Sequence, residues 1–211
     1  MLKADSFGNF KGAVKETAKV LVKGGLIAYP TESFYGLAVE TGNESALKRL
    51  FEVKKRPPGR PVLILTPSAE AVSQYVEYIS PVAAHLIKAF WPGGLTLVFK
   101  AGPHISTLLT AGTGKIGIRL SSHPLANALA KAVGVPISGT SANISGQPAC
   151  RNAEEVLNVF GRDLDLILDG GETVGMTGST VLDVTVDPPQ ILREGLVPGK
   201  QIKQFIQGLC F

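Results

Sequence analysis

The spacing of apolar and polar positions predicts helices and strands in alternation along the chain. Apolar residues recur at helical spacing through residues 10–23, and two glycines then end the pattern. Five further segments show the same spacing, most of them after a capping residue or an N-terminal proline. These predicted helices follow Asn43, run from Ser80 and Pro81 to Phe90, from Pro124 to Val133, from Asn152 with Glu155 to Phe160, and from Lys200 to Leu209.

Short apolar runs bounded by turn residues predict the strands. They are LIAYP at 26–30, PVLIL at 61–65, LTLVF at 95–99, KIGIRL at 115–120, PIS at 136–138, DLILD at 165–169, STVLDV at 179–184 and QILRE at 190–194. Strands separated by helices are typical of an α/β sheet, and the three crowded final strands indicate that some pairs are antiparallel. No internal repeat, low-complexity tract or linker marks a second domain, so we predict one domain over residues 1–211.

Composition favours a soluble cytoplasmic protein. The chain has 211 residues, of which 45% are hydrophobic and 18% charged. No apolar stretch approaches the roughly 20 residues of a membrane-spanning helix, and the first residues lack a signal sequence. Two cysteines, Cys150 and Cys210, are too few for a disulfide framework and have no metal-binding spacing. We therefore expect a reducing compartment and no membrane association.

Charge is concentrated in one short segment. The net charge is +4, and Lys54, Lys55, Arg56 and Arg60 fall close together. This segment predicts contact with an anion, although an ordinary solvated loop has the same pattern.

Several segments match the letters of known motifs but lack the neighbouring structure or residues that those motifs require. GTGKIG at 112–117 has the letters of a dinucleotide fingerprint, but a strand follows it where a helix is needed, and Ile116 replaces the hydroxyl residue of a P-loop. GTSAN at 139–143 lacks the second glycine of a nucleophile elbow. The three histidines have no ligand spacing, so we predict no metal site. Nicotinamide, P-loop and acyl-enzyme chemistry are therefore disfavoured.

Polar segments lie where an α/β sheet has its binding crevice, beyond strand ends. PTESFYGL at 30–37 offers hydroxyls and a carboxylate that could hold a small polar substrate, although a capped turn is an equal reading. KKRPPGRP at 54–61 has prolines that stiffen a loop carrying Lys54 and Arg56, a pair suited to phosphates. This pattern predicts an anion-binding loop.

Two further segments add polar groups. Ser141 and Asn143 lie two residues apart and face one side if the backbone is extended. GSTVLD and ILREG bring Ser179 and Arg193 to adjacent strand positions, and Arg119 adds another cation. For each arginine taken singly, a surface ion pair is the simpler reading.

Together these segments resemble the YrdC-like family of threonylcarbamoyl-adenylate synthases, in its short form without an extra C-terminal domain. The family's PTxTxYGL, KxR and SxN motifs are similar to PTESFYGL, Lys54-Lys55-Arg56 and Ser141-Ala142-Asn143. WPGGLTLVF, IGIRLSSHP, GSTVLD and ILREG follow in the family's order, so the resemblance covers residues 10–195. A non-synthase branch of the fold lacks KxR and SxN, and this chain has both.

The resemblance implies an open, twisted, mixed parallel and antiparallel sheet flanked by helices, with a broad basic concave surface. It also implies a reaction in which L-threonine is carboxylated by bicarbonate or CO₂, and the carbamate attacks the α-phosphate of ATP and releases pyrophosphate. This is the first step of threonylcarbamoyladenosine formation on tRNA, and a tRNA threonylcarbamoyl transferase would be the downstream partner. Mg²⁺ is expected with ATP, bound mainly through substrate and water.

The resemblance also implies residue roles. Lys54 and Arg56 would hold phosphate and the nascent carbamate, and Ser141 with Asn143 would bind the nucleotide and orient the reacting centre. The residues expected to bind substrate are Thr31, Arg119 and Ser179 for threonine, and Arg193 for the nucleotide. The chain departs from the family pattern at Ser33, at Phe34, and at Leu65, where some members have histidine.

Two other functions compete with a synthase. One is a non-catalytic module that binds double-stranded RNA or tRNA, or assists ribosome assembly, through the basic face. No RRM or KH motif supports it, and weak tRNA binding would also suit a synthase. The other is a carbamoyl-transfer domain like that of hydrogenase-maturation proteins, whose acylphosphatase and zinc-finger regions are missing from this sequence.

Overall fold

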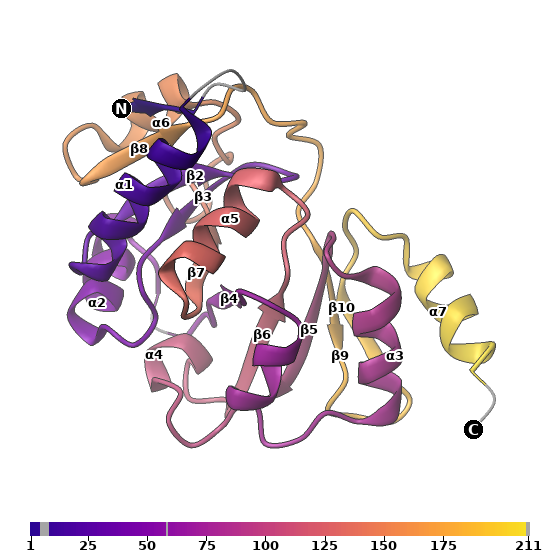
Figure 1. Ribbon diagram of the computed structural model, residues 1–211. Helices are drawn as coiled ribbons and strands as arrows, with labels where there is room; N and C mark the ends of the chain where they lie inside the picture. The colour runs from indigo at the N-terminus through magenta and orange to yellow at the C-terminus, as the bar shows by residue number, and fades with distance from the viewer. Residues whose placement is uncertain (5–8, 58, 210–211) are drawn as a thin grey trace.

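The computed structural model describes residues 1–4, 9–57 and 59–209 (Figure 1). Pro58 and Cys210, which entered the predictions above, lie outside the described residues. The helices are α1 (Phe10–Val22), α2 (Glu44–Val53), α3 (Pro81–Phe90), α4 (Thr107–Thr110), α5 (Pro124–Val133), α6 (Ala153–Phe160) and α7 (Gly199–Gln207), with a 3₁₀ turn η1 (Glu70–Gln74). All six predicted helices are confirmed to within a few residues, and η1 and the short α4 were not predicted.

Side-chain caps set where several helices begin. The Asn43 side chain accepts a hydrogen bond from the Ala46 amide at 3.0 Å at the start of α2. Asn152 Oδ1 accepts from the Glu155 amide at 2.8 Å, as a capping box requires. The Glu155 carboxylate, however, accepts from the amide of Arg151 at 2.7 Å, one residue before the N-cap. The predicted capping residues are thus correct, and the reciprocal bond is displaced by one residue.

Ten strands of the described residues form one mixed sheet. They are β1 (Leu2–Lys3), β2 (Ile27–Pro30), β3 (Tyr35–Ala38), β4 (Leu63–Leu65), β5 (Leu95–Lys100), β6 (Lys115–Arg119), β7 (Ile137–Ser141), β8 (Leu166–Asp169), β9 (Thr180–Asp183) and β10 (Gln190–Arg193). Their spatial order is β1-β8-β2-β3-β7-β4-β6-β5-β9-β10, with the pairs β2–β3, β3–β7, β4–β7, β5–β6 and β9–β10 antiparallel and the rest parallel. The prediction of a mixed sheet is confirmed.

Three features of the sheet differ from the strand predictions, and one is the two-residue strand β1, which was not predicted. For residues 30–37 the sequence left a substrate-holding segment and a capped turn as equal readings and predicted no strand, but Tyr35–Ala38 is a buried strand that pairs with β2, so only the first half of the motif is a turn. The final three strands are also not neighbours. β9 and β10 form the expected antiparallel pair, whereas β8 lies near the opposite edge and pairs in parallel with β1 and β2.

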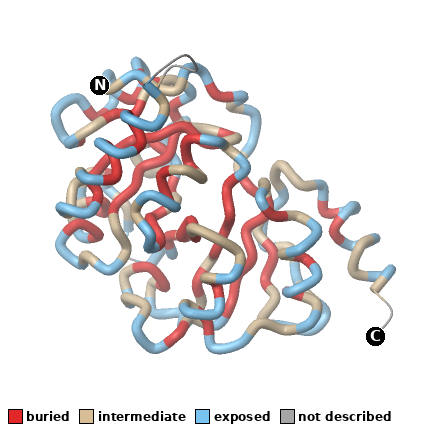
Figure 2. Tube along the Cα trace, in the orientation of Figure 1, coloured by how far each residue is buried: buried red, intermediate tan, exposed pale blue. Residues whose placement is uncertain are grey.

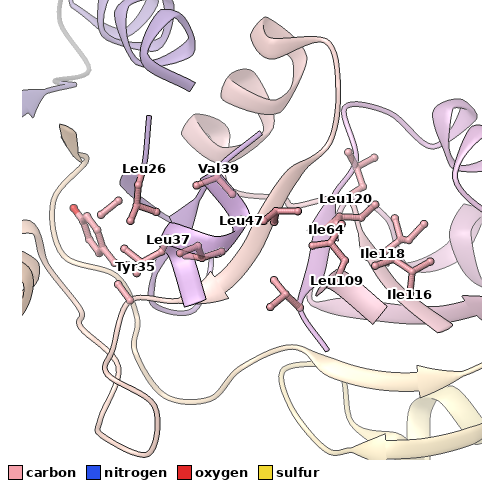
Figure 3. Packing of buried hydrophobic residues seen from close by; sticks show 14 of the residues in the cluster. Leu26, Tyr35, Leu37, Val39, Leu47, Ile64, Leu109, Ile116, Ile118 and Leu120 are labelled. Atoms are coloured by element: carbon pink, nitrogen blue, oxygen red, sulfur yellow. The ribbon is translucent and has the colours of Figure 1, made fainter. Parts of the chain in front are cut away.

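The sheet separates two hydrophobic layers. One face packs against α2, α3, α6 and α7 in a core that includes Leu37, Leu47, Ile64 and Ile118 (Figure 3). The other face packs against α1 and α5 through residues such as Ile27, Leu65 and Ile137. The inner sides of both helices are buried and their outer sides exposed (Figure 2). In the portion of the chain described, no helix is long and apolar enough to cross a membrane.

The α1–α5 layer covers only part of its face of the sheet. Ile137, Gly139 and Ser141 share one face of β7 because side chains alternate along a strand. Ile137 packs against the α1–α5 core, whereas Gly139 and Ser141 line a cavity. The uncovered part of the sheet therefore forms the wall of that cavity.

Candidate functional site

A cavity of about 710 Å³ opens on the uncovered part of the sheet. Its wall contains small residues where larger side chains would fill the space, for example Gly117 on β6 and Gly139 on β7. A Cβ atom added to Gly139 would lie 2.4 Å from Leu63 Cδ1. Six of the eight predicted site residues line this cavity: Thr31, Arg56, Arg119, Ser141, Ser179 and Arg193.

Lys54 lies behind the cavity wall. It is the C-cap residue of α2, and only 1% of it is exposed. Its ammonium donates to the carbonyl oxygens of Ser141 at 2.5 Å and Asn143 at 2.8 Å, and to Asn143 Oδ1 at 3.1 Å. Its own carbonyl accepts from the Ser145 amide at 2.8 Å. Lys54 therefore holds the turn at 141–145 from both its side chain and its backbone.

Lys54 was predicted to hold phosphate and the nascent carbamate, but its ammonium already donates to the turn at 141–145. Burial, with a smaller contribution from nearby Arg56, lowers the pKa of Lys54 to about 7. Asn143 is also turned into this network, since its Oδ1 accepts from Ser141 Oγ at 2.7 Å. Ser141 reaches the cavity, while Lys54 and Asn143 support it from behind. Direct phosphate contact by Lys54 or Asn143 stays a prediction.

Arg56 is held in the basic loop by that loop's own carbonyls. Its Nε donates to the Arg60 carbonyl at 3.1 Å and its Nη2 to the Pro61 carbonyl at 2.6 Å. Burial and the charge of Arg60 lower the pKa of Arg56, but an arginine keeps its charge. The guanidinium is thus oriented before any ligand arrives, with donors left over.

Arg119, at the end of β6, forms a buried ion pair with Glu32. Arg119 Nη1 lies 2.9 Å from Glu32 Oε1, and the two side chains are 6% and 14% exposed. Ser121 Oγ donates to the other carboxylate oxygen at 2.5 Å. Arg119 Nε has no acceptor among the described residues. The pair fixes a cation at the cavity wall and leaves one of its donors unused.

The last two strands supply a third arginine. Arg193 donates from Nη2 to the Ser179 carbonyl at 2.8 Å and to Ser179 Oγ at 3.2 Å. Ser179 Oγ also lies 2.8 Å from Thr96 Oγ1. Burial, with a smaller contribution from Arg119, lowers the pKa of Arg193. The predicted proximity of Ser179 and Arg193 is therefore confirmed.

Thr31 forms the capped turn of its motif and also lines the cavity. Its Oγ1 donates to the Phe34 carbonyl at 2.7 Å and accepts from the Ser33 amide at 3.2 Å, as in a capped turn. The same residue lines the cavity, together with Ser33 and Phe34. Leu65 packs in the α1–α5 core, so the position where some family members have histidine offers no polar group here.

The sequence analysis assigned no individual role to several polar residues in or beside the cavity. Glu32 pairs with Arg119, and Thr96, Lys115 and Asp183 line the cavity. Lys115 and Asp183 form an ion pair at 2.8 Å. The period-two alternation of KIGIR could have found Lys115, because it shares a strand face with Arg119. In the described ranges, no three His, Cys, Asp or Glu side chains come together as metal ligands.

The fold and the cavity define the class of protein. It is an α/β protein whose mixed sheet carries, on an uncovered part of one face, a cavity lined by hydroxyl groups and oriented arginines. Such a site suits small molecules that carry negative charge.

Comparison with known families assigns the chain within this class. The Sua5/YciO/YrdC family model, which is described as "Telomere recombination", matches residues 19–195. The chain belongs to this family.

Relatives at the level of sequence bear one name. The chain is 37% identical over 193 residues to a threonylcarbamoyl-AMP synthase of Pyrococcus abyssi, covering 92% of this chain and 57% of the relative. It is 36% identical to the synthase of Bacillus subtilis, of which it covers 56%. The chain thus spans a little over half the length of these two relatives. A synthase of Vibrio vulnificus is 33% identical and matches over 98% of its own length.

Solved structures give the same assignment. The chain superposes on P. abyssi Sua5 complexed with L-threonine with a TM-score of 0.91 and 36% identity, covering 97% of this chain and 59% of that one. Its TM-score against Escherichia coli YciO is 0.84, with 29% identity and coverage of 91% and 93%. The mixed sheet flanked by helices is therefore the fold of this family.

Proposed function

We propose that the protein is an L-threonylcarbamoyladenylate synthase, which makes threonylcarbamoyl-AMP and pyrophosphate from L-threonine, bicarbonate and ATP. One observation carries the proposal. Six residues from separate segments of the chain, chosen from sequence motifs alone, line a single cavity. The names of the relatives and the L-threonine in the P. abyssi structure support the choice of substrates.

The proposed chemistry needs no protein nucleophile. The threonine amine attacks the carbon of CO₂ and loses a proton, so that a carbamate forms; starting from bicarbonate, the same carbamate forms when a C–O bond breaks and water leaves. A carbamate oxygen then attacks the α-phosphorus of ATP, and the bond to pyrophosphate breaks. Catalysis of such a step consists mainly of positioning the reactants and stabilising the negative charge on phosphate. Oriented arginines at the cavity wall suit that task.

Roles in the site follow from the contacts. Arg119, with Thr31 and Ser179 nearby, would hold the threonine carboxylate and hydroxyl. Arg56 and Arg193 would hold the nucleotide, and Ser141 would orient the reacting centre. Lys54 and Asn143 would act by fixing the position of Ser141. These assignments extend the residue roles that the family resemblance implied.

Mg²⁺ would enter the site with the triphosphate. The carboxylates near the cavity are already paired, Asp183 with Lys115 and Glu32 with Arg119. These residues do not make a protein cage for the ion, and a magnesium bound to phosphate oxygens and water needs none. We also place the reaction in the cytoplasm, where a tRNA threonylcarbamoyl transferase would use the product.

An omission assay tests the proposal. Pyrophosphate release is measured with ATP, L-threonine and bicarbonate together and then with each left out in turn. Release only in the complete mixture is expected. Equal release without threonine would overturn the assignment, and salt-dependent RNA binding without ATP turnover would favour the RNA-binding alternative. Arg119→Gln should raise the KM for threonine more than the KM for ATP.

A further inference from the structure

A second concave surface lies on the solvent side of the α1–α5 layer, outside the cavity. It has a volume of about 590 Å³. One side of it is formed by four lysines, which we call the lysine row: Lys11, Lys15, Lys19 and Lys23. Apolar residues form the remainder: Phe10, Val14, Ala18 and Val22 from α1, with Ala128 and Ala132 from α5. None of these residues lines the cavity described above.

The lysine row is arranged along one stripe of α1. Its members are spaced four residues apart, which separates successive lysines by about 6 Å along the helix axis. All four side chains are exposed. α5 adds Lys131 and no acidic residue, and the only carboxylate on either helix is Glu16, which pairs with Lys19 at 2.7 Å. The surface therefore has a large excess of positive charge.

Repulsion between the lysines of the row lowers the stability of the protein when no partner is bound. Like charges four residues apart on a helix destabilise it by roughly 0.2–0.5 kcal/mol per pair, and the row contains three such steps. Lys11 also lies in the first turn of α1, which has no acidic residue to favour the helix dipole. An anionic partner would turn both penalties into attraction.

The apolar side of the groove narrows the choice of partner. Val22 is 64% exposed, Phe10 is half-buried and Ala132 is exposed. Val14 and Ala18, in contrast, are each only 6% exposed and belong to the α1–α5 core beneath the groove. The alanines of α5 are small enough for another backbone to approach closely. The phosphate backbone of a nucleic acid would pair with the lysines, but it would offer no apolar surface to pack against these groups. An amphipathic helix satisfies both sides at once.

We propose that the groove between α1 and α5 docks an acidic amphipathic α-helix of a partner protein. Carboxylates on one stripe of that helix meet the lysine row, and small or branched apolar residues on the neighbouring stripe pack on Phe10, Val22 and Ala132. α1 has 13 residues and is about 20 Å long, so the docked segment has three to four turns.

Fluorescence anisotropy with a defined probe tests this proposal. The probe is a labelled helical peptide of about 16 residues, with glutamates every fourth position beside a stripe of leucine and alanine. We expect salt-dependent binding. The Lys15→Glu, Lys23→Glu double variant, which leaves the Lys19–Glu16 pair intact, should weaken binding at least tenfold. Val22→Ser should weaken it about threefold, because it removes apolar contact alone.

Matched controls lie on other helices. Lys48→Glu reverses an exposed lysine on α2, and Val159→Ser changes a valine on α6 that is 46% exposed. Both should bind the probe as the unaltered protein does. Circular dichroism of every variant establishes that α1 is still folded.

Three results would overturn the proposal. The first is no binding of the peptide, and the second is equal loss of binding in the Lys48→Glu control. The third is tighter binding of an RNA duplex or of phosphatidylserine vesicles than of the peptide, with no effect of Val22→Ser. The assay contains neither ATP nor threonine, so its outcome is independent of the proposed synthase activity.

Discussion

The protein has two basic regions, and they hold their charge in opposite ways. In the cavity, Lys54 and Arg119 are buried, Arg56 is half-buried and Arg193 is exposed, and each is already hydrogen bonded or ion-paired to protein oxygens. In the lysine row the side chains are exposed, and Lys19 alone has an acidic partner on α1. Cations fixed in advance lose little entropy when a ligand binds, which suits catalysis. Solvated, mutually repelling cations suit reversible docking.

The largest expected effect tests whether the cavity depends on its buried cation. Lys54→Met keeps most of the side-chain volume but removes the ammonium that donates to two carbonyl oxygens and to Asn143 Oδ1. The turn that positions Ser141 should relax, and we expect pyrophosphate release to fall about a thousandfold. Lys55→Met changes the exposed neighbouring residue and serves as the control. Equal activity of the two variants would show that Lys54 does not organise the site.

A smaller effect is expected from breaking a buried ion pair. Glu32→Gln leaves Arg119 without its charged partner at the cavity wall, and the free energy of unfolding should fall by about 3 kcal/mol in urea titrations. Asp165→Asn removes the partner of Arg49 at a pair whose side chains are 38% and 39% exposed. That loss should be about 0–1 kcal/mol. Similar losses in the two variants would remove the contrast between buried and exposed charge.

The low pKa of Lys54 predicts a pH dependence of stability. Between about pH 7 and the usual lysine range, the unfolded chain binds a proton at this residue that the folded protein does not. The stability of the protein relative to Lys54→Met should therefore rise with pH, by up to about 1.4 kcal/mol per pH unit for one proton. Urea titrations from pH 7 to 10 measure this difference. A difference that is flat or falls with pH would contradict the assigned direction.

The smallest expected effect concerns the lysine row, where removing a charge should raise the stability of the protein. Lys15→Gln removes repulsion from Lys11 and Lys19, so thermal unfolding at low salt should show a gain of about 0.5 kcal/mol. On α2, Lys48 lies four residues from both Glu44 and Glu52, and Lys48→Gln should lose a similar amount. High salt should reduce both changes. Changes of equal sign would show that the row is not under electrostatic strain.

Local chemistry explains which parts of the fold could be predicted. Capping residues and apolar spacing located the six longer helices because both signals act within one or two turns. The strand Tyr35–Ala38 was missed because it follows a polar turn directly and has only four residues. The position of β8 depends on pairing with strands far away in the chain, which its own residues do not specify.

The site shows the same division. The residue types and the order of the motifs predicted that Arg119, Ser179 and Arg193 belong to one site, and the three residues line one cavity. The direction of the Lys54 side chain could not be predicted, because its acceptors come from a turn 87 and 89 residues further along the chain. Glu32 was seen only as part of a motif, since its partner belongs to a different strand.

The strand order also affects how the protein is made. β8 inserts between β1 and β2, and β7 inserts between β3 and β4. A growing chain on the ribosome thus carries four early strands, β1 to β4, each of which lacks at least one neighbour until a later strand has been synthesised. Such distant pairings fold slowly and leave strand edges exposed in the meantime. Translation must reach β8 before β1 and β2 gain the strand that joins them, so one edge of the sheet stays open until most of the chain has been made.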